Sequence, residues 1–195
     1  MTPDRRSSRP IVPPGTDGIW TFLFIDMIVF SLFFAIYLAE RLRLPQVFAA
    51  SQAKLDTTYG LINTLILLTS SLFVAEAVAA IRAGKIDWAR TRLGLALACG
   101  ALFSASKLIE YSGKFAIGIS PVTNSFFSFY FLLTMILFLL VLAGMVFLAH
   151  CLVRARAEAG QPGYLAKLEN TGLFWHFVDL LWLFLFPLLY LAGVP

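Results

Sequence analysis

Residues 170–190 read NTGLFWHFVDLLWLFLFPLLY, and they give the clearest indication of the fold class. It is apolar and long enough to cross the hydrocarbon core of a bilayer, which takes about 20 residues of α-helix. It also carries His176 and Asp179, which lie three residues apart and therefore on one face of such a helix. Because ionisable groups are costly in hydrocarbon, both side chains need partners within a helical bundle.

The composition of the whole chain indicates a membrane protein. Of its 195 residues, 59% are apolar and 13% are charged, whereas soluble domains carry about a quarter charged residues. The net charge of +4 does not indicate a nucleic-acid partner, because the basic residues lie mostly in short loops. Cys99 and Cys151 have no metal-ligand spacing, and we expect two inert thiols and no disulfide.

Five segments reach the length of a membrane span, so the predicted fold is an all-α integral membrane bundle of five transmembrane helices. Residues 1–17 contain three arginines and four prolines without an apolar core, which predicts a polar cytoplasmic tail and no cleaved signal peptide. Residues 18–195 are predicted to form one transmembrane domain. Pro187 predicts a kink in the last helix. The expected spans are 18–39, 59–81, 93–115, 122–152 and 172–192.

The distribution of Lys and Arg predicts the orientation. Three lie in the tail, four between residues 82 and 92, and three between residues 154 and 167, all on one side of the membrane. The other side carries four, Arg41, Arg43, Lys54 and Lys114. Positively charged loops stay in the cytoplasm, so we expect a cytoplasmic N-terminus and a periplasmic C-terminus.

Four polar residues are expected in the cytoplasmic half of the bundle, where they form a candidate polar cluster: Asp26, Glu76, His176 and Asp179. Asp26 is interpreted either as a carboxyl satisfied by a neighbouring helix or as a proton-accepting or partner-docking group. Glu76 is interpreted mainly as a residue at a helix end near Arg82. For His176 and Asp179 we favour a packing hydrogen bond.

A second polar pair lies in the outer half of the third span. Lys107 and Glu110 are three residues apart on one helix face, and we expect a structural ion pair. His150 and His176 lie on the same membrane side, so geometry permits a bis-histidine haem, but no motif supports one. From these pairs we expect structural roles, and we expect no catalytic, cofactor-binding or metal-binding residues.

Several segments together resemble subunit III of the haem-copper (cytochrome c) oxidases. Residues 174–186, FWHFVDLLWLFLF, resemble the closing WHFVD-xx-WLFLF helix of that family almost letter for letter. Residues 62–71, INTLILLTSS, resemble its NT-xx-LL-x-SS helix, and residues 93–111 resemble its LG…F…EY helix. The first span fits the family's FI-x-SE-x-x-FF helix loosely, with Asp26 where the family has a membrane-buried carboxylate.

The departures from the family pattern narrow the resemblance. Most members have seven helices, whereas five are expected here. The H-G-x-H-V motif of the family's penultimate helix falls at residues 137–141, where both histidines are replaced, by Leu137 and Leu140. This pattern looks closest to the NorE-type branch, subunit-III-like proteins encoded beside bacterial nitric oxide reductase.

The resemblance implies a supporting role. Subunit III carries no haem or metal, binds lipid between its helices, packs against the catalytic subunit, and is thought to support proton uptake, oxygen access and durability. We therefore expect a non-catalytic accessory subunit of a respiratory haem-copper enzyme in the bacterial inner membrane, with nitric oxide reductase of denitrification as the expected enzyme and a phospholipid as the one candidate ligand. The alternatives are subunit III of a terminal oxidase, or a small proton- or solute-conducting protein that uses Asp26 and Glu76.

Overall fold

The computed structural model describes residues 15–191, and all the regular elements in this part of the chain are helices. The predicted polar tail, up to residue 14, and residues 192–195 lie outside the described residues. In chain order the elements are α1 (Asp17–Arg43), α2 (Pro45–Gln52), α3 (Thr57–Arg82), α4 (Ile86–Ala116), α5 (Ser125–Glu158), α6 (Pro162–Phe186) and a short π-helix, η1 (Pro187–Leu191).

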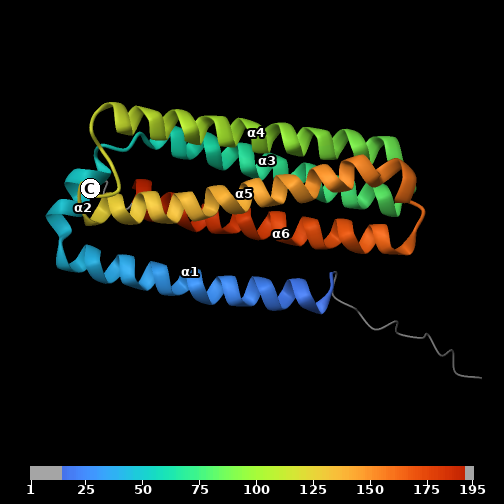
Figure 1. Ribbon diagram of the computed structural model, residues 1–195, viewed down its shortest axis with the longest axis horizontal. Helices are drawn as coiled ribbons and strands as arrows, with labels where there is room; N and C mark the ends of the chain where they lie inside the picture. The colour runs from blue at the N-terminus through green and yellow to red at the C-terminus, as the bar shows by residue number, and fades with distance from the viewer. Residues whose placement is uncertain (1–14, 192–195) are drawn as a thin grey trace, which may run out of the picture.

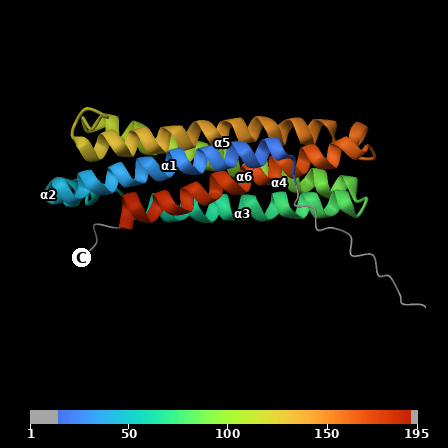
Figure 2. The same ribbon diagram turned by 90° about the horizontal axis from the view of Figure 1, so that it is seen from below.

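Helices α3, α4, α5 and α6 form an antiparallel four-helix bundle, in which each helix packs against two of the others. Helix α1 lies outside this bundle, along the seam between α5 and α6 (Figures 1 and 2). The start of α1 and the α3–α4 and α5–α6 turns lie together, here termed the Asp17 end. Helix α2, the α4–α5 connection and η1 lie at the opposite end, the α2 end.

Five helices are long and apolar enough to cross a membrane: α1, α3, α4, α5, and α6 continued by η1. This confirms the prediction of a five-span helical protein. Exposed side chains along these helices are largely Leu, Ile, Val and Phe, as a surface in contact with lipid requires. The last span is the most buried, with 56% of its apolar window inside the protein against 17% for α1, so α6 is the central helix.

Local signals explain where the helices start and stop. Asp56 caps α3 by accepting a hydrogen bond from the Thr58 amide at 2.8 Å. At the other end of α3, Gly84 adopts φ +72°, and Lys85 N bonds to the Ala80 carbonyl, which closes the helix in a Schellman arrangement. Helix α5 starts at Ser125 and not at residue 122, because the Asn124 side chain caps it through the Phe127 amide.

Helix α2 was not predicted, since Pro45 was interpreted as part of a loop. Proline is tolerated in the first turn of a helix, and Pro45 starts a short helix here. Likewise α6 begins at Pro162, ten residues before the predicted start. Helix α2 acts as a clasp, because Gln52 Nε2 donates to the carbonyls of Leu188 and Leu189 in η1 at 3.1 and 3.2 Å.

Two tryptophans join the central helix to α3. Trp175 Nε1 donates to Ser70 Oγ at 3.1 Å, and Trp182 Nε1 donates to Thr64 Oγ1 at 2.9 Å. Both indoles are fully buried. Each hydroxyl also donates to a backbone carbonyl, so all the polar groups in these two contacts are paired. At Pro187 the helix widens from α to π geometry, at the position where a kink was predicted.

Candidate functional site

A fully paired polar group is buried in the bundle, towards the α2 end. It consists of Lys107 and Glu110 from α4, Tyr130 from α5 and Tyr190 from η1, and is called here the Lys107 cluster. Lys107 Nζ lies 2.8 Å from Glu110 Oε2. The other carboxylate oxygen, Glu110 Oε1, accepts from both tyrosine hydroxyls at 2.7 Å. Lys107 has no exposed surface, and Glu110 is 6% exposed.

Aromatic rings enclose the charge of Lys107. Its ammonium lies 4.9 Å from the ring centre of Tyr111 and 5.4 Å from that of Trp182. The two cluster tyrosines add further faces at 5.2 and 5.9 Å, and their oxygens lie 3.4 and 3.3 Å from Nζ. Such contacts stabilise a desolvated cation. The ion pair expected within α4 is therefore present and connects α4, α5 and η1.

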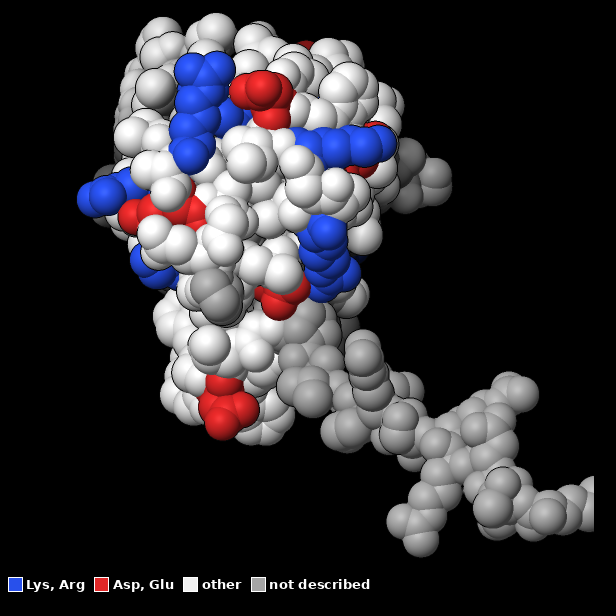
Figure 3. All heavy atoms as spheres, turned by 90° about the vertical axis from the view of Figure 1, so that its right-hand side faces the viewer, with Lys and Arg blue, Asp and Glu red and all other residues white. Residues whose placement is uncertain are grey.

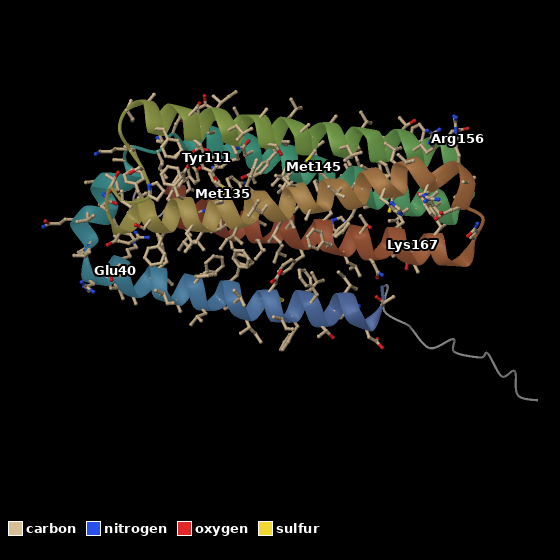
Figure 4. All side chains as sticks on the ribbon, in the orientation of Figure 1. Glu40, Tyr111, Met135, Met145, Arg156 and Lys167 are labelled. Atoms are coloured by element: carbon tan, nitrogen blue, oxygen red, sulfur yellow. The ribbon has the colours of Figure 1, made fainter. Side chains whose placement is uncertain are left out.

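The surroundings of the Lys107 cluster are also polar and paired. Tyr111 donates to Thr134 Oγ1 at 2.8 Å, and Thr134 donates to the Tyr130 carbonyl at 2.6 Å. Figure 4 shows Tyr111 between α4 and α5, near the α2 end, whereas Arg156 and Lys167 lie at the Asp17 end. The cluster holds its polar groups in closed contacts, an arrangement typical of a structural network.

His176 and Asp179 lie on the side of α6 that faces α3. The His176 Nδ1 atom forms a hydrogen bond with the Ser71 hydroxyl of α3. Asp179 is 5% exposed, and neither of its carboxylate oxygens makes a hydrogen bond to a described residue, although the Ser71 hydroxyl lies beside it. Ser71, His176 and Asp179 thus form a small polar group with unused hydrogen-bonding capacity.

Glu76, another predicted member of that cluster, has a different partner. Glu76 on α3 pairs with Arg92 on α4 at 3.0 Å. Arg82, its expected neighbour, pairs instead with Glu169 at 2.8 Å. Asp26 lies on α1, which α6 separates from α3 (Figure 2). The structure therefore joins His176 and Asp179 with Ser71, and does not bring Glu76 to them.

The two histidines do not share a site. His176 lines a groove between α1 and α6, and His150 lines a different groove beside the start of α1. Within residues 15–191, no group of three His, Cys, Asp or Glu side chains is placed to hold a metal ion. The geometry gives no support to the bis-histidine arrangement that the sequence left open.

Both grooves border α1 and open near the Asp17 end. The larger, of about 820 Å³, is lined by apolar side chains of α1 and α6 together with Thr21 and His176. The smaller, of about 280 Å³, combines Phe147 and Phe174 with polar groups that include Lys167 and Asn170. The surface of the Asp17 end carries both charge signs (Figure 3), in pairs such as Arg82–Glu169 and Arg156–Asp87.

Comparison with known proteins identifies the family. The model of the family described as cytochrome c oxidase subunit III matches residues 16–194, which is nearly the whole chain. The chain belongs to the cytochrome c oxidase subunit III family. The helical bundle described above is therefore that of a subunit-III-type protein.

Curated relatives agree with this assignment. Cytochrome c oxidase subunit 3 of Synechocystis sp. is 32% identical over 183 residues, covering 89% of this chain and 74% of the relative. Cytochrome bo(3) ubiquinol oxidase subunit 3 of Pseudomonas putida is 29% identical, with 91% and 85% covered. Quinol oxidase subunit 3 of Bacillus spizizenii is 27% identical, with 91% and 86% covered. With its five apolar helices, the chain is a multi-pass bacterial membrane protein.

Sequence reasoning missed three members of these sites. Tyr130 was not singled out, and Tyr190 was quoted only as the last residue of the stretch 170–190. Ser71 was quoted only within the family-like SS motif. The available signal was the buried charge itself, because Lys107 in hydrocarbon requires partners on neighbouring helices, and tyrosines at the same depth supply them.

Proposed function

We propose that this protein is subunit III of a bacterial terminal oxidase, of the cytochrome c- or quinol-oxidising type. The observation that carries the proposal is the family match over residues 16–194, together with relatives that are oxidase subunits. The proposed role is accessory: the bundle packs against the catalytic subunit and stabilises it. The proposed orientation places the Asp17 end in the cytoplasm, on the charge asymmetry of the loops.

The polar interior supports a stabilising role. The Lys107 cluster, the two tryptophan–hydroxyl bonds and the clasp of α2 are internal contacts that join α1, α3, α4, α5 and α6. A buried charge pair with its hydrogen bonds satisfied favours one arrangement of helices over others. We propose that Asp26, His176 and Asp179 also help to hold the helices in this arrangement, through the contacts of α6 with α1 and α3.

Nitric oxide reductase is the second candidate partner. Its support is the replacement of both histidines of the family motif by leucines. Leu137 is fully buried in the core, so an apolar side chain fills the position where most members carry the first histidine. The relatives reported above are oxidase subunits, and for this reason the terminal oxidase is our leading proposal.

We propose that a phospholipid occupies the smaller groove. Its apolar wall of Phe147 and Phe174 suits an acyl chain, and Lys167 and His150 at its rim suit a phosphate. In the proposed orientation this rim lies at the cytoplasmic surface, where headgroups lie. A basic pocket between helices on that side is a common headgroup site.

Co-purification tests the proposed partner. The tagged chain is isolated in mild detergent from its native bacterium, grown either aerobically or under denitrifying conditions, and its partners are identified by mass spectrometry and by a haem spectrum. We expect the catalytic subunit of a terminal oxidase. Recovery with nitric oxide reductase would select the second candidate, and recovery without any haem-copper partner under either condition would refute both. An unrelated multi-pass protein with the same tag serves as the control.

Proton flux tests the conducting alternative. Liposomes that contain the isolated chain are given a pH gradient, and the native protein is compared with Asp26→Asn and Glu76→Gln variants. We expect no flux above that of empty liposomes, because Glu76 is paired with Arg92 and α6 separates α3 from α1. Flux that the Asp26→Asn variant abolishes would establish the conducting function and overturn the accessory role as the sole function.

A further inference from the structure

The larger groove has its polar groups gathered at one end. It lies between α1 and α6 and has a volume of about 820 Å³, in the range of small-molecule sites. Leu23, Phe24 and Met27 of α1 line it, facing Phe177 and Leu180 of α6. The half of the groove nearer Asp17 contains its polar side chains, together with Leu173; these are Trp20, Thr21 and His176.

His176 presents a hydrogen-bonding edge to this groove. Its Nδ1 atom is occupied by the Ser71 hydroxyl, and its Nε2 atom forms no hydrogen bond to a described residue. When Ser71 donates to Nδ1, the ring proton resides on Nε2. In that tautomer the exposed edge of the ring, which lines the groove, is a donor available to an occupant. Because Ser71 holds the ring in place, this donor is preorganised.

The charge of the groove selects the kind of ligand. None of its lining side chains is Lys, Arg, Asp or Glu, whereas the smaller groove has Lys167 at its rim. A phosphate headgroup in the larger groove would have no counter-charge, in a setting where an unpaired charge is expensive. A neutral head with hydrogen-bond acceptors fits it better.

The shape of the groove favours a ligand with a long apolar tail. A further hollow of about 220 Å³ shares Met27, Phe177 and Leu180 with the first and continues to Phe34 and Phe184. From Thr21 to Phe34, α1 rises by about 20 Å, at about 1.5 Å per residue. The two hollows therefore form one extended apolar channel with a neutral polar end.

We propose that this channel binds an isoprenoid quinone. Its ring carbonyl accepts a hydrogen bond from His176 Nε2, and its tail lies along the α1–α6 seam towards Phe34. The site is a binding site only, and the proposal includes no redox step. It rests on the groove itself and extends the proposed function only by placing a quinone store beside an oxidase.

Photolabelling tests the site directly. The full-length protein is placed in phosphatidylcholine nanodiscs with a photoreactive azido-ubiquinone, illuminated and digested, and the labelled peptides are quantified by mass spectrometry. We expect the label on peptides of α1 and α6 that border the groove. Excess ubiquinone should displace it, and an equal excess of phosphatidylglycerol should not.

Two histidine variants provide the matched comparison. His176→Phe removes the donor while keeping a planar apolar ring, and we expect at least a fivefold loss of labelling. His150→Phe, in the smaller groove, should leave labelling unchanged. Unchanged labelling in His176→Phe, label spread evenly over all lipid-facing helices, or equal displacement by phosphatidylglycerol would overturn the proposal.

A second variant keeps the test decisive if His176→Phe does not fold, as judged by circular dichroism and gel filtration. Met27→Trp fills the channel without changing the histidine, and it should also lower labelling at least fivefold, whereas full labelling of this variant would overturn the proposal. Co-purification with the oxidase is measured on the same variants. Normal co-purification with absent labelling would refute the quinone site and leave the proposed function standing.

Discussion

Lys107 shows how a single residue organises this protein. A lysine with no exposed surface in a membrane helix is costly unless its charge is neutralised and its donors are used. Here Glu110 neutralises it, two tyrosines share the carboxylate, and four aromatic rings surround the ammonium. The cluster draws residues from α4, α5 and η1, so its loss would loosen three elements at once.

Replacing Lys107 alone should strongly destabilise the protein. Lys107→Met leaves the Glu110 charge buried without its cation, and breaking a buried pair in this way costs about 3–5 kcal/mol. The double variant Lys107→Met/Glu110→Gln removes both charges and keeps an acceptor for the tyrosines, so most of that loss should be recovered. Unfolding is followed by circular dichroism in detergent micelles.

The control for this prediction is the exposed pair at the Asp17 end. Arg154 and Glu158 lie 3.2 Å apart on α5, with the arginine side chain 55% exposed. Arg154→Met should change stability by no more than about 0.5 kcal/mol, as is usual for surface pairs on a helix. Equal effects of the two single variants would contradict the role given to the Lys107 cluster.

At the scale of elements, the α5–α6 contact depends on one small residue. Gly144 on α5 lies against the buried indole of Trp175, and a Cβ atom at this position would lie 2.7 Å from Trp175 Cε3. Small residues allow membrane helices to approach closely, and here the closeness is needed to seat a large ring. Trp175 in turn bonds to Ser70, so the contact is transmitted to α3.

Gly144→Ala should therefore destabilise the protein, although alanine is the better helix former. The cost of overpacking is expected at about 1–3 kcal/mol. Gly94→Ala on α4 is the matched control, because a Cβ atom there meets nothing within 4 Å, and it should stabilise by up to about 1 kcal/mol. Thermal unfolding in micelles measures both, and a stabilising Gly144→Ala would contradict the packing argument.

The start of α3 predicts a pH effect. The Thr58 amide beside Asp56 holds the pKa of that carboxyl below its ordinary value of 3.8. The ionised cap therefore contributes stability at neutral pH, and this contribution is lost as the pH falls through the lowered pKa. Asp56→Ala should lower the melting temperature at pH 7, by an amount that shrinks below pH 3.8.

Asp56→Asn serves as the control, because the amide oxygen still caps the helix and does not titrate in this range. Its melting temperature should remain near that of the native protein at pH 7. If the difference between the native protein and Asp56→Ala stayed constant down to the acid limit, the cap would not be the source of the effect.

At the level of the whole molecule, α1 packs on the outside of a four-helix core. It packs along the α5–α6 seam, and helix α2 fastens it at one end. There Tyr37 donates to the Leu188 carbonyl, and Gln52 donates to the carbonyls of Leu188 and Leu189. Ser51 accepts a bond from Asn124, which adds the start of α5 to the same junction.

Gln52→Leu should open this junction. The Leu189 carbonyl loses its side-chain donor and the Leu188 carbonyl keeps only that of Tyr37, so we expect a loss of about 1–3 kcal/mol. Amide hydrogen exchange should increase at residues 188–191 and in the last turn of α1. Gln161→Leu is the control, since the Gln161 side chain makes no capping bond at the start of α6. Equal hydrogen exchange of η1 in the two variants would refute the role given to Gln52 in holding α2 against η1.

The sequence by itself determined the class of protein, the number of spans and the family. These depend on patterns that act locally: runs of about 20 apolar residues, and the motif at residues 174–186. It also placed Lys107 beside Glu110, because residues three apart on a helix are neighbours whatever the tertiary fold.

Only the tertiary structure decided which helices meet and which polar groups pair across them. In the folded chain Glu76 forms an ion pair with Arg92, and His176 forms a hydrogen bond with Ser71. Glu110 accepts hydrogen bonds from two tyrosines that lie 20 and 80 residues away in the sequence. Helix α2 was likewise seen only in the structure, because the hydrogen-bond partners of its side chains, such as Leu188 and Asn124, lie far away in the sequence. Such pairings depend on how each helix is rotated about its axis and on its depth in the bundle. The packing of helix faces against one another determines both, and the residue pattern along one segment does not reveal them.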